Sequence, residues 1–346
     1  MNHLDSFDTE RLRAERLQDD HLEFILQMHQ DERVMAHLGG PRSTEQTADY
    51  MKQNLAHWAD HGYGIWILRE RATGHFAGRG GLRNAELGGK DEVEVAYGLM
   101  PEFWNHGLAT EFVGAAVRIG FSDLGLTSLT CVTQRENKAS LHVLKKTDFH
   151  FERDIVCKGT PSLLFRRSII QKLSAGSWTE PEVIAEEVFD EARIQTVEKL
   201  AYEIWNEHFT PIIGKAQVDY MLEKFQSIQA ISGQIAQGFQ YYLIRMDEGY
   251  IGYTGVQPKE DELFLSKLYI TSSQRGKGYG RKVVQFLEGR ARDKGLNTMT
   301  LTVNKNNLDT IRAYEKFGFE ILGPVVQDIG GGFVMDDYKM VKEIER

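Results

Sequence analysis

The residues best suited to chemistry lie in one stretch, Leu268–Gly280, with the sequence LYITSSQRGKGYG. A strand pattern leads into three alternating glycines, and a helix pattern begins among them, although a glycine inside a helix costs roughly 1 kcal/mol against alanine. Without Cβ atoms, successive backbone N–H groups can approach an anion, and a helix N-terminus adds partial positive charge. Arg275 and Lys277 add full charges at the rim. The stretch therefore predicts either a pyrophosphate-binding turn or a tight strand-to-helix turn without a ligand.

Two common phosphate-binding motifs do not fit this stretch. The pattern GxxxxGK[ST] is absent because Lys277 is followed by glycine rather than by a hydroxyl residue. The spacing also differs from GxGxxG, and no acidic residue ends the following strand as dinucleotide binding requires. Residues 275–280, RGKGYG, instead resemble the R/Q-x-x-G-x-G/A acetyl-CoA motif of GNAT acetyltransferases. Two further segments of that family follow at its usual distance, Val303–Asn307 (VNKNN) and Tyr314–Phe319 (YEKFGF).

This resemblance covers residues 183–346 and implies a sheet splayed open between its fourth and fifth strands, with the pantetheine of acetyl-CoA in the opening. It implies that backbone groups of Leu268 and Ile270 meet pantetheine and that Asn307 contacts the cofactor near the thioester. Tyr314 would donate the proton that the departing thiolate takes up. The residues that would hold the pyrophosphate are Arg275, Gly276, Lys277, Gly278, Tyr279 and Gly280.

The chemistry of acetyl transfer agrees with these roles. A tyrosine with a pKa of ~10 is protonated at neutral pH and can donate to a thiolate whose acid has a pKa of ~8.5. Tyr314 could also be a core aromatic, because it shares a helix face with Ile311 and Phe317. An alkylamine with a pKa of ~10.4 is neutral in only about one part in 10³ at pH 7, so we expect a carboxylate to help. The candidates are Glu262 as the base and Glu207, Asp336 and Asp337 as bases or contacts for a cationic substrate, and each of them could equally be solvated.

The N-terminal half carries a second version of the motif. Residues 101–111, PEFWNHGLATE, resemble the ribosomal-protein-alanine branch of the same family, where W-G-x-G-x-A-T-E is usual, and the resemblance covers about residues 7–168. It implies a catalytic strand carboxylate at Glu94, although a solvated strand residue also fits. The residues implied to bind the cofactor are Leu99, Asn105, Gly107, Ala109, Thr110 and Asn137.

Three positions depart from the pattern of this branch. Asn105 replaces the first glycine, and Leu144 stands in the place of Tyr314, so the tyrosine acid is missing. Asp148 replaces the glycine of K-x-G-F, so we expect the turn before Phe149 to form in a different way. The N-terminal half is therefore expected to be the weaker catalyst or to be non-catalytic.

The two halves repeat one order of elements. Gly107 and Gly278 are 171 residues apart, as are Ala109 and Gly280, whereas Asn137 and Asn307 are 170 apart, as are Phe149 and Phe319. Matching residues at a nearly constant separation indicate duplication of one fold. Residues 168–181 lose periodicity and gather Ser, Gly, Thr and Pro, which predicts a linker between domains at 1–170 and 182–346. We expect an α/β (α+β) protein of two tandem GNAT folds, each a splayed, mixed, mostly antiparallel sheet flanked by helices.

Periodicity and turn residues place the elements. Apolar residues at helical spacing predict helices at 19–30, 44–61, 108–124, 139–146, 191–206, 216–225, 278–294 and 308–317. Alternating or continuous apolar runs predict strands at 64–69, 75–83, 92–99, 128–133, 240–246, 250–256, 262–270, 298–303, 321–327 and 338–344. A hairpin turn is expected at Asp247-Glu248-Gly249.

The composition of the chain limits the classes of ligand and partner that we expect. The net charge is −9 and no dense block of lysine and arginine occurs, so nucleic acid is not expected as a ligand. Cys131 and Cys157 cannot form a disulfide framework or a metal site of usual spacing. An acidic N-terminus without an apolar stretch, and the absence of any run of ~18 apolar residues, predict a cytoplasmic protein without a membrane partner. The chain could be a monomer or a homodimer.

The function predicted from these patterns is transfer of an acetyl group from acetyl-CoA to a primary amine, chiefly in the C-terminal domain. Residues 205–221 and 330–340 resemble bacterial acetyltransferases of the spermidine/spermine type, which implies a small amine such as a polyamine. Two alternatives are an acetyl-CoA-binding sensor with one inactive domain and an acetyltransferase that acts on protein N-termini.

Overall fold

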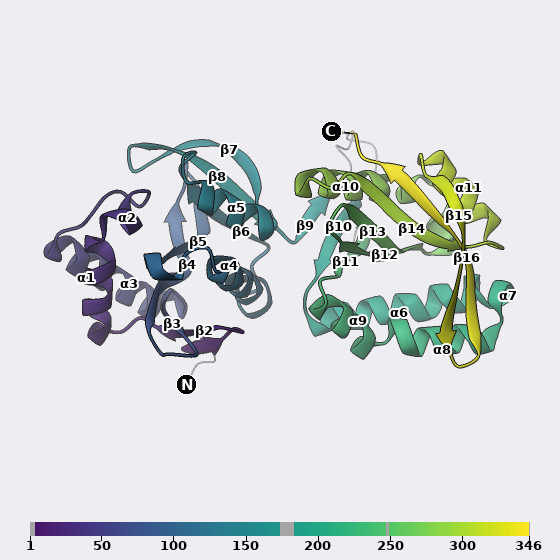
Figure 1. The fold of residues 1–346 in the computed structure, drawn as a ribbon, viewed down its shortest axis with the longest axis horizontal. Coiled ribbons are helices and arrows are strands. Elements are labelled where there is room, and N and C mark those ends of the chain that lie inside the picture. Colours follow the sequence, from purple (N-terminus) through teal and green to yellow (C-terminus); the bar gives the residue numbers. More distant parts are fainter. Residues whose placement is uncertain (1–3, 174–182, 247–248, 346) are drawn as a thin grey trace. The chain divides into compact units, whose positions relative to one another are not determined.

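The computed structural model describes residues 4–173, 183–246 and 249–345. The chain divides into two compact units, Met1–Ser168 (unit 1) and Ile169–Arg346 (unit 2). Each unit contains one eight-stranded mixed sheet flanked by helices (Figure 1), which confirms the predicted fold class. Among the described residues, none of the helices is both long and apolar enough to span a lipid bilayer.

Unit 1 begins with two short strands and a group of helices, and its remaining strands then alternate with two helices. The α4 helix continues into a π-helical turn, Ile119–Asp123, so the helix expected at 108–124 is interrupted. The elements are β1 (Ser6–Asp8), β2 (Leu12–Arg16), α1 (Leu22–Gln30), α2 (Glu32–Met35), α3 (Thr44–His61), β3 (Ile65–Glu70), β4 (Phe76–Glu86), β5 (Asp91–Leu99), α4 (Leu108–Arg118), β6 (Ser128–Thr133), α5 (Lys138–Lys146), β7 (His150–Cys157) and β8 (Thr160–Ser168).

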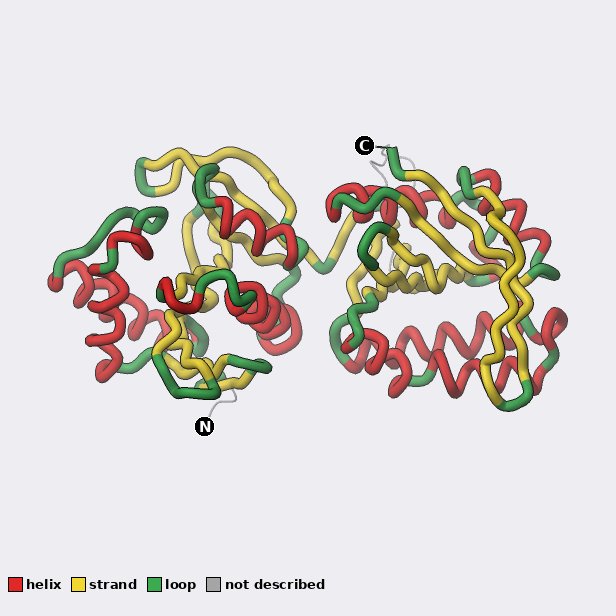
Figure 2. Tube along the Cα trace, in the orientation of Figure 1, coloured by secondary structure: helices red, strands yellow, loops and turns green. Residues whose placement is uncertain are grey.

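Unit 2 follows the same order, and its described residues form four α-helices after the first strands where those of unit 1 form three. The elements are β9 (Ile170–Lys172), β10 (Val183–Val188), α6 (Glu191–His208), α7 (Thr210–Ile213), α8 (Lys215–Gln226), α9 (Ile228–Ala236), β11 (Gln240–Met246), β12 (Gly249–Pro258), β13 (Glu262–Ile270), α10 (Tyr279–Lys294), β14 (Thr298–Asn304), α11 (Leu308–Lys316), β15 (Glu320–Gly330) and β16 (Phe333–Glu343). The long β15–β16 hairpin reaches α8 (Figure 2), where the Tyr220 hydroxyl donates to the Ile329 carbonyl at 2.7 Å.

Both sheets are antiparallel except at one place. The strand orders are β1-β2-β3-β4-β5-β6-β8-β7 and β15-β16-β14-β13-β12-β11-β10-β9. The parallel neighbours are β5 with β6 and β13 with β14. The β13–β14 pairing covers only residues 262–265 opposite 298–301, and the β5–β6 pairing only Glu94 opposite Thr130. Beyond these pairs the two strands separate, and each sheet is open there.

Helices cover both faces of the unit 2 sheet. On one face, Val283 and Leu287 of α10 pack in a core with Leu301 and Met340. On the other face, residues of α6 and α8 pack in a second core around Tyr241 and Tyr253. The alternation of apolar residues along these strands produces the two cores, because successive side chains point to opposite faces.

The predicted linker is partly a strand. Residues 170–172 form β9, which pairs with the edge strand β10, so the expectation of an irregular segment from 168 to 181 is wrong at its start. Residues 174–181 of the predicted linker lie outside the described residues, as do Asp247 and Glu248 of the predicted hairpin turn. The sequence patterns predict no element at β1, β2, α2, α7, α9, β7, β8 or β10, which are short or lack a clear period.

The turn before Phe149 is another correction. Asp148 adopts a positive φ of 60°, and Gly318, its counterpart before Phe319, has a φ of 90°. The turn is therefore made in the same left-handed conformation in both units, and not in a different way. Aspartate is one of the few residues with a side chain that tolerate this region of backbone space.

A glycine at the centre of each sheet allows neighbouring strands to pack closely. A Cβ atom added to Gly252 of β12 would lie 2.1 Å from the carbonyl oxygen of Tyr269, and one added to Gly78 of β4 would lie 2.3 Å from that of Gly98. Both neighbours are backbone atoms, which cannot rotate away. The same addition to Gly289, inside α10, meets nothing within 4 Å.

We predict opposite effects of alanine at these two kinds of glycine. Gly252→Ala should destabilise the protein by about 1–3 kcal/mol, because the strands must move apart. Gly289→Ala should stabilise it by up to about 1 kcal/mol, because alanine favours the helix. Urea unfolding of both variants measures these changes, and a Gly252→Ala variant as stable as the wild type would contradict the close strand contact.

Candidate active site

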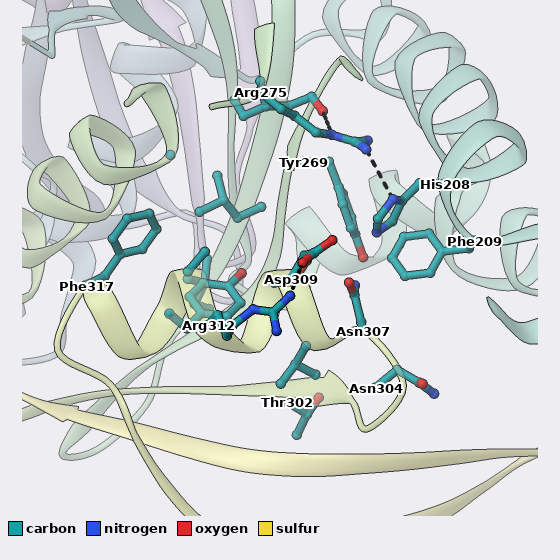
Figure 3. Close-up of a pocket in the computed structure, with 18 of the residues that line it drawn as sticks. His208, Phe209, Tyr269, Arg275, Thr302, Asn304, Asn307, Asp309, Arg312 and Phe317 are labelled. Carbon is teal, nitrogen blue, oxygen red and sulfur yellow. Dashed lines mark hydrogen bonds and ion pairs between the residues drawn. The ribbon is translucent and has the colours of Figure 1, made fainter. Parts of the chain in front are cut away.

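A cavity of about 910 Å³ opens in unit 2 where β13 and β14 separate. Its wall consists of the ends of these two strands, the turn before α10, the first turns of α10 and α11, and parts of α6, α8 and β16 (Figure 3). This volume lies within the ~300–1,000 Å³ usual for small-molecule sites. Of the predicted residues, those that line it are Leu268, Ile270, Arg275, Gly276, Gly278, Tyr279, Gly280, Asn307, Tyr314 and Asp337.

The opening follows from the pairing of β13. The last residue of β13 in the parallel pairing is Leu265, which lies opposite Leu301 of β14. Both strands continue beyond this pair, β13 to Ile270 and β14 to Asn304. A register shift between Gly255 and Val256 of β12 leaves Ser266 as the extra residue of β13. Leu268 and Ile270 therefore border the cavity on the side where β13 has lost its parallel neighbour.

The glycine turn presents its backbone to this cavity. Gly276 and Gly278 have φ values of +76° and +84°, and a Cβ atom added at either position meets nothing within 4 Å. Gly278 is the N-cap of α10, and no side chain caps that helix. The first backbone N–H bonded inside the helix is that of Lys282, so the described structure shows no protein acceptor for the N–H groups of residues 276–281. Open space, unused donors and a helix N-terminus together fit a diphosphate group.

The three long side chains of the turn differ in position. The Arg275 Nε donates to the Ile270 carbonyl at 2.8 Å, and its Nη1 lies 3.1 Å from the Nδ1 of His208 (Figure 3). Lys277 donates to the Gln274 side chain at 3.0 Å and does not line the cavity. The Tyr279 hydroxyl donates to the sulfur of Met246 at 3.1 Å.

His208 and Asn307 link α6 to the start of α11. Burial and the nearby Arg275 charge lower the pKa of His208, and a hydrogen bond with the Asn307 side chain opposes this shift. A neutral His208 can accept from Arg275 through Nδ1. Asn307 is buried, and Figure 3 shows it beside His208, Phe209 and Tyr269. Asn307 therefore lines the cavity and also fixes the ring of His208.

Three ionisable groups meet on the inner wall. Tyr314 is 8 % exposed, and burial raises its pKa. Asp337 is 4 % exposed, and its pKa is raised to about 6, chiefly by burial, with a hydrogen bond to Thr302 acting in the opposite direction. Burial also raises the pKa of Tyr269, and the adjacent Tyr314 and Asp337 raise it further. One cavity is therefore lined by a protonated phenol and by a carboxyl group with a raised pKa.

The other predicted carboxylates lie outside this cavity. Glu262 stands at the closed end of the sheet, where it accepts from Lys259 at 3.0 Å and pairs along the strand with Thr298. Glu207 is exposed on α6, whereas its neighbour His208 lines the cavity. Asp336 is exposed and forms an ion pair with Lys305. Only Asp337 of the four candidates is brought to the site, because alternation on β16 turns it and Asp336 to opposite faces.

The corresponding turn in unit 1 has the same backbone conformation. Asn105 has a φ of +63° and Gly107, the N-cap of α4, a φ of +77°, close to the values at Gly276 and Gly278. The departure from glycine at residue 105 is therefore accommodated, since asparagine tolerates this conformation. Ala109 and Thr110 lie in the first turn of α4, and Leu99 is buried at the end of β5.

Two further unit 1 positions differ from unit 2. The Asn137 side chain accepts from the backbone N–H of Ser140 at 3.0 Å and so caps α5. Leu144 is fully buried and has no group that could donate a proton.

An arginine that the sequence reading did not assign supports the unit 1 turn. The Arg11 Nε donates to Glu111 of α4 at 2.7 Å, and its Nη1 donates to the His106 carbonyl at 2.7 Å. The segment Thr9–Leu12 therefore contacts the first turn of α4 through hydrogen bonds.

Glu94 occupies a buried ion pair. It is 6 % exposed, and both Nε and Nη2 of Arg83 donate to its Oε2, at 2.9 and 2.7 Å. Glu94 is therefore not a solvated strand residue. Its carboxylate is already held by a guanidinium, which opposes a role as a base.

Sequence reasoning also missed the aromatic part of the unit 2 site. Trp205, Phe209 and Tyr269 lie with ring centroids 4.6 to 5.8 Å apart and line the cavity. They come from α6, the residue that follows it, and β13. The signal in the sequence is the aromatic pair Trp205 and Phe209 at the end of α6, within the segment 205–221 that resembles the spermidine/spermine type.

Comparison with known proteins finds a family model for each unit. Residues 11–150 match the model described as "Acetyltransferase (GNAT) domain", and residues 199–319 match the one described as "Acetyltransferase (GNAT) family". An uncharacterized N-acetyltransferase of Bacillus subtilis, YoaA, is 30% identical over 148 residues, which are 42% of this chain and 82% of that protein. A second B. subtilis protein, the uncharacterized YkkB, is 24% identical over 160 residues, which are 46% of this chain and 93% of that protein.

Solved structures of similar fold include a putative GnaT-family acetyltransferase from Bordetella pertussis. It is 20% identical, with a TM-score of 0.43, and the match covers 47% of this chain and 99% of that one. Acetyl-CoA is the cofactor of the family that both sequence models describe. The chain belongs to the GNAT family of acetyl-CoA-dependent N-acetyltransferases.

Proposed function

We propose that unit 2 is the main catalytic unit and moves the acetyl group of acetyl-CoA directly to a small primary amine such as a polyamine. The observation that carries this proposal is one cavity with the glycine turn on its wall and with Tyr314 and the buried Asp337 on the same wall. Direct transfer is favoured because Cys131 and Cys157 both lie in unit 1, so unit 2 has no thiol to carry an acyl group.

Asp337 is suited to take the proton of the incoming amine. At pH 7 an alkylammonium must lose a proton at a cost of roughly 4–5 kcal/mol before it can attack. With a pKa raised to about 6, Asp337 is mostly ionised at that pH and is a stronger base than an ordinary aspartate. A base whose pKa lies near the working pH gives efficient proton transfer. Asp337 thus replaces Glu262 as the proposed base.

Tyr314 is suited to return a proton at the end of the reaction. Burial keeps its phenol protonated, and Tyr314 lines the same cavity as the glycine turn. Bound acetyl-CoA supplies an activated thioester at this point. The Tyr314 Oη proton can then be donated to the sulfur that leaves, while residues 276–281 hold the diphosphate through their N–H groups.

The wall around Asp337 favours a cationic acceptor. The faces of Trp205, Phe209 and Tyr269 attract cations, and Asp337 supplies a negative charge. An amine with an apolar chain fits this combination better than an acid does. The alternatives remain a protein N-terminus as the acceptor, or a unit that binds acetyl-CoA without turnover, and acceptor panels separate them.

We propose that unit 1 binds acetyl-CoA but contributes little to turnover of amines. Asn105, Gly107, Ala109 and Thr110 repeat the backbone geometry of the unit 2 turn. Leu144 lacks a proton to donate, and Glu94 is paired with Arg83. Counting the coenzyme A molecules bound per chain by native mass spectrometry tests this: two would support the proposal, and one would contradict it.

Tyr314→Phe should lower kcat by about 10²-fold or more, because the general acid is lost. The affinity for acetyl-CoA should stay nearly unchanged, since the variant keeps the turn at 275–280. Thiol-release kinetics with an amine panel that includes spermidine measure both quantities. Tyr202→Phe is the matched control, because Tyr202 is 61% exposed on α6. Equal turnover in Tyr314→Phe and in the control would exclude the acid role.

Asp337→Asn should lower kcat/KM by about 10²-fold at pH 7. In the wild type, kcat/KM should fall as the pH drops below about 6, where Asp337 becomes protonated. In Asp337→Asn, kcat/KM should no longer show this fall below pH ~6. The difference in kcat/KM between the variant and the wild type should shrink at high pH, where free amine is abundant. Asp336→Asn, at the exposed neighbour, should behave as the wild type. A deficit that is the same at every pH would argue against Asp337 as the base.

Asp337 should also destabilise the folded protein as the pH rises. Its folded pKa is about 6 and its ordinary value 3.8, so between these values the folded chain holds a proton that the unfolded chain has lost. The free energy of unfolding therefore falls with rising pH across this window. Asp337→Asn should gain about 1–2 kcal/mol over the wild type between pH ~4 and ~7. Denaturant titrations at the two pH values measure this gain. A free energy of unfolding that changes with pH in the same way in the variant and in the wild type would contradict the raised pKa.

A further inference from the structure

Unit 1 contains an excess of positive charge around Tyr50, where Arg79 is buried and Arg42 and Arg83 are half-buried. Arg79 and Arg83 of β4 and Arg42, before α3, gather around Tyr50, with the guanidinium carbons of Arg42 and Arg79 5.2 and 5.7 Å from its ring centroid. Burial lowers the pKa of Arg42, and the nearby charges of Arg79 and Arg83 lower it further. The carboxylate that neutralises this cluster is Glu94, and Arg83 already engages it.

Arg79 is the most unusual member of the cluster. It is 5% exposed, and within the described part of the chain it forms no hydrogen bond or ion pair, while its Nε is buried and unused. The hydroxyl of Tyr50, which is 7% exposed, is also buried without a partner. An unpaired buried charge is strongly unfavourable for folding. Two unused buried donors on neighbouring side chains, with the Arg79 guanidinium carbon 5.7 Å from the Tyr50 ring centroid, therefore favour an anion there.

His29 does not supply the missing counter-charge. It is fully buried, it contacts Thr47 through Nδ1 at 3.1 Å, and Arg42 approaches its Nε2 at 3.4 Å. Burial and the charges of Arg42 and Arg79 lower its pKa to about 3, so it is neutral. The cluster as a whole therefore keeps two guanidinium charges in excess of its carboxylate.

The strand pairing places Arg79 at the position in unit 1 that corresponds to Tyr253 of unit 2, the strand partner of Tyr269. Leu99 and Ile270 are 171 residues apart, as are the two helix N-caps, Gly107 and Gly278. With the same offset of 171 residues, Gly98 corresponds to Tyr269, which lines the cavity of unit 2. The strand partner of Tyr269 is Tyr253, and that of Gly98 is Arg79. A pair of aromatic rings in unit 2 is therefore replaced in unit 1 by a guanidinium beside a residue without a side chain.

We propose that unit 1 binds the carboxylate of a small molecule at Arg79, Arg42 and Tyr50, so that the two units accept ligands of opposite charge. A carboxylate is the favoured anion because the unused Nε of Arg79 belongs to the planar fork that binds two carboxylate oxygens side by side. The hydroxyl of Tyr50 supplies a further donor. The role of this ligand as an acetyl acceptor rests on the proposed function, but its binding does not.

The test is a calorimetric melting experiment on the full chain with succinate, its neutral analogue succinamide and inorganic phosphate, at constant ionic strength. Succinate should raise the melting temperature and succinamide should not. Arg79→Met should abolish the response and should raise the melting temperature of the free protein by roughly 2–4 °C, because it removes an unpaired buried charge. Arg135→Met, at an exposed arginine that pairs with Asp154, should change neither result.

Arg79→Lys provides a second variant that keeps the charge. Lysine lacks the planar fork, so the affinity for succinate should fall by about tenfold or more while the protein stays folded. The proposal would be overturned if Arg79→Met melted at a lower temperature and kept its response to succinate, or if phosphate stabilised the wild type and succinate did not. Spermidine acetylation that survives in Arg79→Met and is lost in Asp337→Asn would separate this site from the proposed function of unit 2.

Discussion

The early end of the parallel pairing between β13 and β14 is the constraint on which the unit 2 site depends. Four residue pairs hold the strands together up to Leu265 and Leu301, and beyond them the strands separate. The separation leaves room for a ligand, and it brings the turn at 275–280 to the wall of the same cavity as α11 and β16. The glycines matter because side chains at residues 276 and 278 would have to adopt a left-handed backbone conformation and would fill the space in front of the N–H groups.

Burial then decides the chemistry of the side chains that face this space. Desolvation raises the pKa of both Tyr314 and Asp337, which keeps the phenol protonated and moves the carboxyl group towards neutral pH. In unit 1 the same fold surrounds a different set of charges, with Arg79 at the position of Tyr253 and a leucine at the position of Tyr314. The two units thus share the backbone conformation of the turn, whereas the side chains at the corresponding positions differ.

The sequence predicted well whatever depends on local patterns. Helix α3 and strands β6, β11 and β13 have the predicted bounds, because their periodicity is clear and caps or turn residues end them. The glycine turns were found for the same reason. The ion pair of Glu94 with Arg83, the isolation of Arg79 and the role of Tyr269 could not be predicted, because they depend on which strands lie side by side. Glu262 and Glu207 appeared suitable in sequence, but their strand and helix direct them away from the cavity.

Amide hydrogen exchange, measured with and without coenzyme A, tests the central claim most directly. If the N–H groups of residues 276–281 bind the diphosphate, their exchange should slow markedly on addition of coenzyme A, because the described structure offers them no other acceptor. Adenosine without phosphates should have no such effect. Unchanged exchange across this turn at a concentration of coenzyme A that saturates the protein would contradict the account.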